Sequence, residues 1–263
     1  MERTFVRNLV SVIIPVYNSE KFIKSTLESV IKQTYSEIEI VIVDDCSTDS
    51  SRQIVEKITN TQSIAESQKS RKIFYYRQPI NQGAAVARNK ALELASGQYI
   101  AFLDSDDMWK PEKLEKQISF MKSRNIGFCF SAIEMINQTG EVVKSKRDVK
   151  EEVTYSFLLK NTMIPTSSVV IDRNIVGDFQ MPLMRGGQDY ATWLMLLRKV
   201  GTAYGINEAL VQYRIGHSSL SSNKLNSLKQ VWNIQTRQEK INKIEAVFNL
   251  FCFCFNALKK YFL

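Results

Sequence analysis

Residues 99–107 have the sequence YIAFLDSDD. A short apolar run bounded by polar residues is typical of a strand buried inside a sheet. The run leads directly into Asp104, Asp106 and Asp107, so the strand delivers carboxylates at its carboxyl end. Because ligands of open α/β sheets bind outside the carboxyl ends of the strands, this segment predicts an α/β fold with an acidic site at that edge.

A second strand of the same kind lies upstream. Residues 38–43 form the β-branched run IEIVIV, which stops at Asp44 and Asp45. The carboxyl ends of parallel strands meet at one edge of a sheet, so both acidic clusters should face the same crevice. Either cluster alone could be a set of solvated acids at a turn.

The first hundred residues alternate strands and helices. Residues 10–15 and 72–76 are further predicted strands. Helices are predicted after Ser19, which can cap one, after residues 47–49, and over residues 84–95, where Gly97 ends the helix. The β-α-β-α-β order predicts a mostly parallel central sheet.

Beyond residue 107 the pattern changes to α+β. We expect a helix over residues 114–121, strands over 126–136 and 167–171, and a helix that begins at Asp189. No linker rich in Ser or Gly divides the chain. We expect two fused halves, residues 1–107 and 108–221, followed by a tail over residues 222–263.

Composition narrows the class of protein. The chain is 44% hydrophobic and 24% charged, which is typical of globular proteins. Its net charge of +8 favours polyanionic partners such as nucleic acid, acidic lipid or phosphorylated ligands. Four scattered cysteines form no disulfide framework, which fits a reducing compartment. No apolar stretch approaches the roughly 20 residues of a membrane-spanning helix, and we expect none.

The tail has an amphipathic pattern over residues 237–263. Lysines accompany an apolar stripe that comprises Ile241, Ile244, Val247, Phe248, Phe251, Phe255 and Leu258. A basic helix with such a stripe is typical of helices that lie on a membrane surface. The alternative is that the stripe packs against the rest of the chain or a second subunit.

The aspartates at residues 104–107 need a neutralising partner, because clustered carboxylates repel one another. Mg²⁺ or Mn²⁺ bound by one or two carboxylates keeps positions open for water and phosphate oxygens. The cluster therefore indicates a nucleotide-diphosphate ligand, and Arg88 could contact the same phosphates.

Five blocks in a fixed order resemble the family 2 glycosyltransferases of the GT-A fold. They are VSVIIPVYN (10–18), IVIVDDCSTD (40–49), NQGAAVARNKALELASGQYIAFLDSDDMWKPEKLEKQ (81–117), GGQDYATWLMLLRKVG (186–201) and YRIGHSSLS (213–221). A DxD triplet or a DD pair alone is frequent by chance, but the shared order strengthens the match. The resemblance implies a Rossmann-like nucleotide-sugar-binding half with a mostly parallel sheet, fused to an α+β acceptor half. The resemblance does not include the helical tail.

The resemblance implies roles for residues on the donor side. Asp45 would hydrogen-bond the pyrimidine edge, and Arg88 would lie near it or near the phosphates. Asp104 would face the ribose or a metal-bound water, and Asp106 would bind Mn²⁺ or Mg²⁺ on the diphosphate. Cys46 stands where the family commonly has Gly, and we interpret it as a tolerated small residue. The other donor-binding residues would be Pro15, Val16, Tyr17, Asn18 and Ser105, with Tyr17 near the base.

The resemblance also implies a catalytic base. Asp189 takes that role alone, because Gln188 stands where the family often has Glu. His217 matches a position that in some members reaches the metal or the diphosphate. One base and one displacement would invert the anomeric centre and form a β-glycosidic bond from an α-linked donor.

The implied reaction moves a hexose from a nucleotide sugar, with UDP-glucose or UDP-galactose favoured, to a lipid-diphosphate-linked saccharide. Many bacterial relatives use such a step in O-antigen or capsule synthesis. The implied location is the bacterial cytoplasm, at the inner face of the cytoplasmic membrane, with peripheral contact through the tail. No nucleic-acid-binding motif is visible, and no such partner is expected.

Other functions remain alternatives at this point. A phosphoacceptor receiver domain also places an acidic pair and an Asp at strand ends, although the chain length argues against it. A nucleic-acid-binding protein is suggested by the charge alone. A dinucleotide dehydrogenase is disfavoured, because the first strand–helix turn, PVYNSE (15–20), lacks the glycines that approach a pyrophosphate.

Overall fold

The computed structural model describes residues 4–64, 72–161, 163–216 and 224–262. Its strands form one sheet in the order β3-β2-β1-β4-β9-β6-β10-β5, with β7 beside β6 and β8 beside β10. The strands are β1 (Val6–Val16), β2 (Ile38–Asp44), β3 (Lys72–Arg77), β4 (Gly97–Phe102), β5 (Met108–Trp109), β6 (Phe128–Ile136), β7 (Val142–Arg147), β8 (Glu152–Thr154), β9 (Val170–Asp172) and β10 (Thr202–Arg214).

The predicted parallel part of the sheet is confirmed. Strand β1 pairs in parallel with both β2 and β4, and β2 pairs in parallel with β3. All seven residues of β2 are buried, as expected for a central strand covered on both faces. Val16 lies opposite Asp44 in the register, so β1 and β2 end at the same edge.

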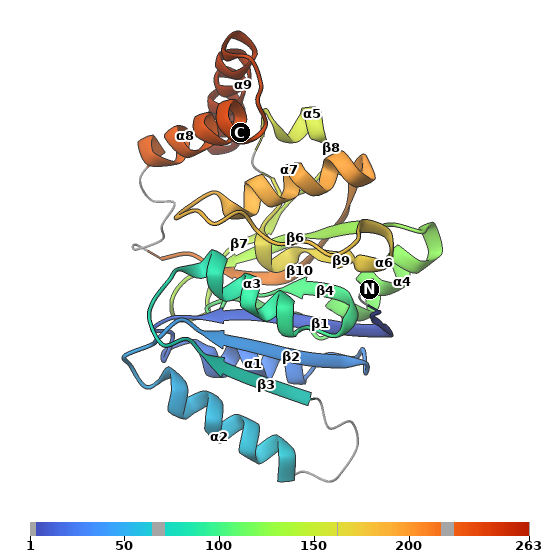
Figure 1. Cartoon of the computed structure of the whole chain (residues 1–263), viewed down its shortest axis with the longest axis vertical. Helices are drawn as coiled ribbons and strands as arrows, with labels where there is room; N and C mark the ends of the chain where they lie inside the picture. Colours follow the sequence, from blue (N-terminus) through green and yellow to red (C-terminus); the bar gives the residue numbers. More distant parts are fainter. Residues whose placement is uncertain (1–3, 65–71, 162, 217–223, 263) are drawn as a thin grey trace.

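Helices cover both faces of this sheet (Figure 1). One face packs against α1 (Ile23–Ile31), α2 (Ser51–Ile64) and α4 (Lys113–Arg124). The other packs against α3 (Ala84–Leu94) and α7 (Gln188–Val200). Successive side chains of a strand point to opposite faces, so the residues of β1 alternate between the two cores. Val12 and Ile14 pack on the side of α1, α2 and α4, and Ile13 packs on the side of α3 and α7.

The sheet continues without interruption past residue 107. Strand β9 pairs antiparallel with β4 on one side and with β6 on the other. The β6 strand then pairs in parallel with β10, a 13-residue strand that the sequence pattern did not predict. Two register shifts lie between Ile206 and Val211, and these irregularities break the alternation of apolar residues that would have identified the strand. The division of the chain at residue 107 remains a prediction.

Two predicted helix boundaries are wrong. Helix α1 begins at Ile23, and the hydroxyl of Ser19 contacts Ser105 instead of capping the helix. The tail is not one helix from residue 237: it consists of α8 (Lys224–Asn233), a π-helical turn η2 (Ile234–Gln238) and α9 (Lys243–Phe262). Lys240 adopts a positive φ of 54°, which ends the helical path between η2 and α9.

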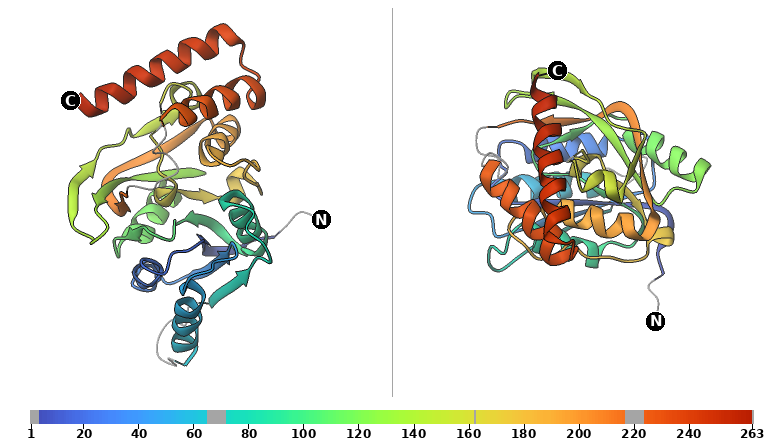
Figure 2. Two further views of the ribbon diagram at one scale, coloured as in Figure 1. Left: turned by 90° about the vertical axis from the view of Figure 1, so that its left-hand side faces the viewer. Right: turned by 90° about the horizontal axis from the view of Figure 1, so that it is seen from above.

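The tail helices lie on the half of the chain that follows residue 107. Helix α8 contacts both η2 and α9, and α9 extends along one end of the molecule, the end opposite α2 (Figures 1 and 2). Short helices α5 (Tyr155–Leu158) and α6 (Arg173–Val176) and the 3-10 turn η1 (Thr166–Ser168) complete this half. Within the described residues, no helix is long and apolar enough to span a membrane.

The junction of β1 and β4 depends on the absence of a side chain at Gly97. A Cβ atom there would lie 2.5 Å from the backbone oxygen of Leu9 and 2.8 Å from Ser11 Oγ. Because the first neighbour is backbone, we expect Gly97→Ala to lower the free energy of unfolding by about 1–3 kcal/mol in a urea titration. In Gly216→Ala the new Cβ meets only the end of the Gln138 side chain, at 3.2 Å, and the change should stay within about 0.5 kcal/mol. Equal losses in both variants would contradict this account.

Lys113, at the start of α4, is fully buried, and its Nζ has no hydrogen-bond partner. Burial lowers the pKa of this amine to about 7, although Nζ lies 4.0 Å from the centre of the Trp109 ring, a contact that favours the charged form. From about pH 7 to about 10 the unfolded chain holds a proton on this amine that the native chain has lost. The amine therefore makes stability rise with pH across that window.

We expect Lys113→Met to stabilise the protein by an amount on the order of 1–2 kcal/mol at pH 6, because it removes an unsolvated charge. The gain should shrink as the pH approaches 10. Urea unfolding of both proteins at several pH values measures the difference. Lys122→Met, at an exposed position on the same helix, is the control and should show no such trend. A gain at Lys113 that is independent of pH would contradict the prediction.

Candidate functional site

The loops after β1 and β2 are tied to one another. The backbone N–H of Asn18 donates to Ser47 Oγ at 3.0 Å, and the N–H of Thr48 donates to Asn18 Oδ1 at 2.9 Å. Val16 is buried and its side chain belongs to the core, so only its backbone can face a ligand. Tyr17, by contrast, is 50% exposed, and its ring is available to a ligand.

The paired aspartates after β2 have different surroundings. Asp44 is buried and accepts hydrogen bonds from the Tyr75 hydroxyl at 2.6 Å and from the Ser47 N–H at 2.8 Å. It therefore holds the loop together. Cys46 adopts a φ of 64°, in the left-handed region, which explains why glycine suits this position.

Asp45 fixes the loop that precedes α3. Its Oδ1 accepts from the Gln82 N–H and from Gln78 Nε2, both at 2.8 Å, and its Oδ2 accepts from the Gly83 N–H at 2.7 Å. These bonds set the start of the helix that carries Arg88. Contact between Asp45 and a pyrimidine remains a prediction.

The DSD segment after β4 lies beside these loops. Arg88 is buried and forms an ion pair with Asp104, and the hydroxyls of Ser105 and Ser19 are 2.6 Å apart. The predicted donor-side residues of β1, α3 and the DSD segment are thus brought together. Arg88 Nε is buried and has no hydrogen-bond partner among the described residues.

Asp106 is exposed at the rim of the site, but its carboxyl is partly desolvated. Desolvation and the neighbouring Asp104 together raise the pKa of Asp106 to about 6. Among the described residues, no other side chain donates a hydrogen bond to the Asp106 carboxylate. A cation would relieve the repulsion between Asp104 and Asp106.

Asp107 has a positioning role that the sequence did not reveal. It is buried, and desolvation together with Asp106 and Asp104 holds its pKa well above the usual range. Its oxygens accept from the Ser167 hydroxyl at 2.5 Å and from the Arg214 N–H at 2.8 Å, and Arg214 Nε donates to the Asp106 carbonyl at 2.8 Å. The acidic loop is therefore anchored to η1 and to the end of β10.

Asp189 lies in the first turn of α7, as predicted, and Thr166 connects it to the acidic loop. The Thr166 hydroxyl donates to Asp189 Oδ2 at 3.3 Å, while the next residue, Ser167, contacts both Asp107 and the N–H of Asp104. The turn η1 thus contacts both acidic groups, which are more than 80 positions apart in the chain.

The tail supports the loop before Asp189. Gly187 adopts a φ of 73°, and a Cβ there would lie 2.8 Å from Ile234 Cδ1. A Cβ on Gly186 would lie 2.2 Å from Gln230 Nε2. Both partners belong to the tail, in η2 and α8, so the segment outside the sequence blocks forms part of the wall of this site.

The acidic residues fit a divalent ion held jointly with a ligand. Among the described residues, no three His, Cys, Asp or Glu side chains are grouped to hold a metal ion. Asp104 and Asp106 supply two carboxylates, which suits Mg²⁺ or Mn²⁺ because such ions keep positions for phosphate oxygens and water. His217 lies outside the described residues, and its predicted role as a ligand remains a prediction.

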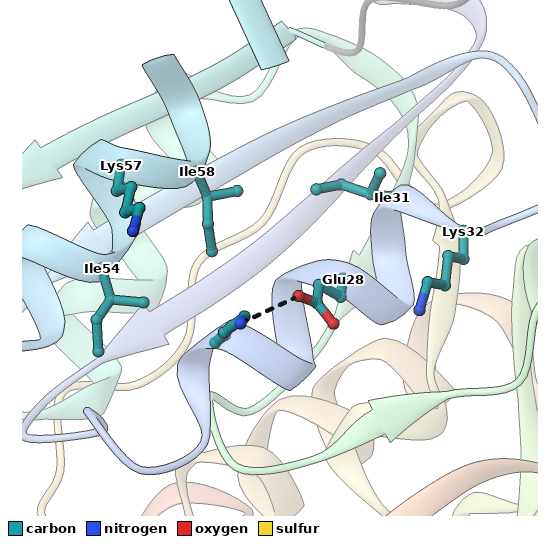
Figure 3. Close-up of a pocket in the computed structure, with 7 residues that line it drawn as sticks. Glu28, Ile31, Lys32, Ile54, Lys57 and Ile58 are labelled. Atoms are coloured by element: carbon teal, nitrogen blue, oxygen red, sulfur yellow. Dashed lines mark ion pairs between the residues drawn. The ribbon is translucent and has the colours of Figure 1, made fainter. Parts of the chain in front are cut away.

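A separate groove of about 420 Å³ lies between α1 and α2 (Figure 3). Its walls include Ile31, Ile54 and Ile58, and its one carboxylate, Glu28, is paired with Lys24 at 3.9 Å. None of the predicted site residues lines it.

Comparison with known proteins identifies the family. The profile described as glycosyl transferase family 2 matches residues 11–181. TuaG of Bacillus subtilis, provisionally described as a teichuronic acid biosynthesis glycosyltransferase, is 44% identical over 252 residues, 96% of this chain and 97% of TuaG. WfgD of Escherichia coli, described as a UDP-Glc:alpha-D-GlcNAc-diphosphoundecaprenol beta-1,3-glucosyltransferase, is 40% identical over 228 residues, 86% of this chain and 85% of WfgD.

Solved structures agree on the fold. TarS 1-349 of S. aureus, in complex with UDP, has a TM-score of 0.68 at 23% identity and aligns with 92% of this chain and 69% of its own. The mannosyltransferase PcManGT of Pyrobaculum calidifontis, in complex with GDP-Man and Mn²⁺, has a TM-score of 0.68 at 17% identity, over 92% of this chain and 67% of its own.

The chain belongs to glycosyltransferase family 2. It is a glycosyltransferase with the GT-A fold, as the sequence blocks predict. The alternatives of a receiver domain, a nucleic-acid-binding protein and a dinucleotide dehydrogenase are therefore wrong.

The hydroxyl of Ser167 is expected to hold the acidic loop in place. Ser167→Ala removes the donor to the buried Asp107 and the acceptor of the Asp104 N–H, so we expect a loss of about 1–3 kcal/mol in the free energy of unfolding. Ser123→Ala, which removes an exposed hydroxyl bonded only to the Phe120 carbonyl, should change it by less than about 0.5 kcal/mol. A silent Ser167→Ala would mean that this hydroxyl does not anchor the loop.

Proposed function

We propose that this chain is an inverting, metal-dependent glycosyltransferase that moves a hexose from UDP-glucose or UDP-galactose to a lipid-diphosphate-linked saccharide. The product is β-linked and enters a bacterial surface polysaccharide such as O-antigen or capsule. The observation that carries the proposal is the placement of Asp189 and the DSD loop on either side of η1. The catalytic base and the group that binds the diphosphate must be near neighbours, because the acceptor attacks the same carbon that the diphosphate leaves.

The donor binds at the ends of β1, β2 and β4. Tyr17 lies beside the nucleotide base, and Asp45 contacts the pyrimidine edge. Pro15, Asn18 and the backbone of Val16 complete the wall of the nucleotide pocket. Arg88, which pairs with Asp104 at the end of β4, lies near the diphosphate and favours the charge that builds on this leaving group. Asp104 faces the ribose or a metal-bound water, and Ser105 is a further donor-binding residue.

Asp106 and Asp104 would hold a Mn²⁺ or Mg²⁺ ion, with His217 as a further ligand. Such an ion would neutralise part of the negative charge on the diphosphate as this group leaves. The raised pKa of Asp106 supports this assignment, because its cause includes an unrelieved repulsion from Asp104.

Asp189 is the catalytic base. It accepts the proton of the acceptor hydroxyl as that oxygen attacks the anomeric carbon from the side opposite the diphosphate. A single displacement inverts the configuration, so an α-linked donor yields a β-linked product. Thr166 and the Tyr190 N–H each bond one oxygen of Asp189, which orients the carboxylate.

The names of the relatives support the substrate class. WfgD is described as using UDP-Glc and a diphosphoundecaprenol-linked acceptor, and TuaG is assigned to teichuronic acid synthesis. The solved neighbours hold UDP in one case and GDP-Man with Mn²⁺ in the other. We place the enzyme at the inner face of the cytoplasmic membrane, where a lipid-linked acceptor is available, with peripheral contact through the tail.

A donor screen tests the proposal. We expect metal-dependent hydrolysis of a UDP-sugar, and less with GDP- and dTDP-sugars. Asp106→Ala should lose metal-dependent donor binding in calorimetry, because it removes the exposed carboxylate. Asp189→Ala should bind the donor normally, while its transfer rate falls by about 10²–10⁴-fold.

Asp148→Ala is the matched control, since this exposed carboxylate pairs only with surface groups such as Lys146. It should leave binding and turnover unchanged. Full turnover in Asp189→Ala would remove this residue as the base, and donor binding that is independent of metal and of Asp106 would overturn the metal assignment.

A further inference from the structure

We propose that the outer face of α9 binds the surface of an anionic lipid bilayer, and that this contact sets the enzyme's orientation on the membrane. The outer face is defined by Ile244, Val247, Phe248, Phe251 and Phe255. Membrane contact is thereby assigned to this one face of α9 and not to the tail as a whole.

The inner face of α9 is already occupied. Ala246 and Asn249 are each 1% exposed, and Asn249 Nδ2 donates to Gln235 Oε1 at 3.2 Å. Gln235 Nε2 in turn donates to the Leu159 carbonyl at 2.7 Å. Nearer the end of the helix, Asn256 Nδ2 donates to the Lys160 carbonyl at 3.1 Å. These polar contacts fix which side of α9 faces the protein.

The outer face is strongly apolar and exposed. Its exposed fractions are 86% for Ile244, 59% for Val247, 57% for Phe248, 70% for Phe251 and 61% for Phe255. The spacing of three or four residues places these side chains on one side of the helix. Contiguous exposed apolar side chains mark interaction surfaces in proteins, since water is a poor solvent for them.

The charge around this face selects the occupant. Residues 224–263 contain seven basic and two acidic residues, a net of +5 out of +8 for the whole chain. One of the two acids, Glu239, is paired with Arg198. Lys160 Nζ lies 5.3 Å from the centre of the Phe248 ring, so positive charge reaches the apolar face itself.

An apolar stripe on a basic tail, with Lys160 beside Phe248, suits anionic lipid, where the rings enter the headgroup region and basic side chains meet phosphates. A second copy of this chain would bring the same positive charge against itself. We therefore assign the face to a bilayer and not to a dimer.

The position of α9 gives this contact a consequence for the reaction. The helix lies at the end of the molecule away from α2 (Figure 2). Its neighbours η2 and α8 form the wall beside the loop that precedes Asp189. A bilayer at α9 therefore places the base nearer the lipid than the nucleotide-binding strands are. This last step rests on the proposed function, whereas lipid binding does not.

The test uses the full chain in vesicle flotation. We expect it to float with vesicles that contain phosphatidylglycerol, and at least tenfold less with pure phosphatidylcholine vesicles. Phe251→Gln with Phe255→Gln should lower binding to the anionic vesicles at least tenfold. The matched control is Val142→Gln with Val143→Gln, which changes exposed apolar residues on β7 and should bind as the wild type does.

The outcomes separate the possibilities. Wild-type protein that does not bind anionic vesicles, or a Phe251/Phe255 variant that binds them fully, overturns the proposal. Sedimentation that shows a dimer, broken by the same variant, assigns the face to a second copy and also overturns it. Hydrolysis of the donor in the absence of vesicles should be equal in wild type and variant, so a failure of lipid binding is distinguishable from a failure of the proposed activity.

Discussion

Three carboxyl groups within four residues repel one another at the end of β4, and the surrounding structure relieves that repulsion. Arg88 pairs with Asp104, while Ser167 and the Arg214 N–H donate to Asp107. The pKa values of Asp106 and Asp107 nevertheless both stay raised, because desolvation and the neighbouring carboxylates disfavour their charged forms. Among the described residues, only Asp104 of the three acids has an ion-pair partner, and of the other two only Asp106 is exposed to a ligand. This is the arrangement expected where a cation and a diphosphate complete the site.

The same hydrogen bonds join segments that are far apart in the chain. Ser167 and Thr166 belong to η1, which follows a long and irregular part of the chain, yet they contact the acidic loop and Asp189 respectively. The site is assembled from both of these segments. It depends on a continuous sheet, in which β9 lies between β4 and β6 and brings η1 to the edge where the parallel strands end.

The tail extends this arrangement to the loop that precedes Asp189. Helix α8 and η2 occupy the space that the two glycines before Asp189 leave open, and α9 packs on them through buried amides. A side chain at Gly187 would collide with Ile234, so the loop and the tail are matched to each other. Differences in the tail between relatives would therefore act on the loop that precedes Asp189.

Short-range patterns in the sequence determined much of this protein. The apolar runs that end at Asp45 and Asp104, and the helical spacing between them, specify a parallel sheet whose binding edge is acidic. The family followed from five blocks in order, and Asp189 was found at the start of its predicted helix. These features are local, because a strand or a helix start is encoded within about ten residues.

Only the tertiary structure decided which groups surround the acids. Asp107, Ser167 and Arg214 are distant in sequence, and no spacing rule relates them. Strand β10 was missed because its bulges break the alternation, although its pairing with β6 brings Arg214 to the site. The face of α9 that is exposed also depends on long-range contacts, since the apolar stripe alone is compatible with packing or with lipid. Local chemistry specified the elements, whereas burial and hydrogen bonds between distant segments determined the site that they form.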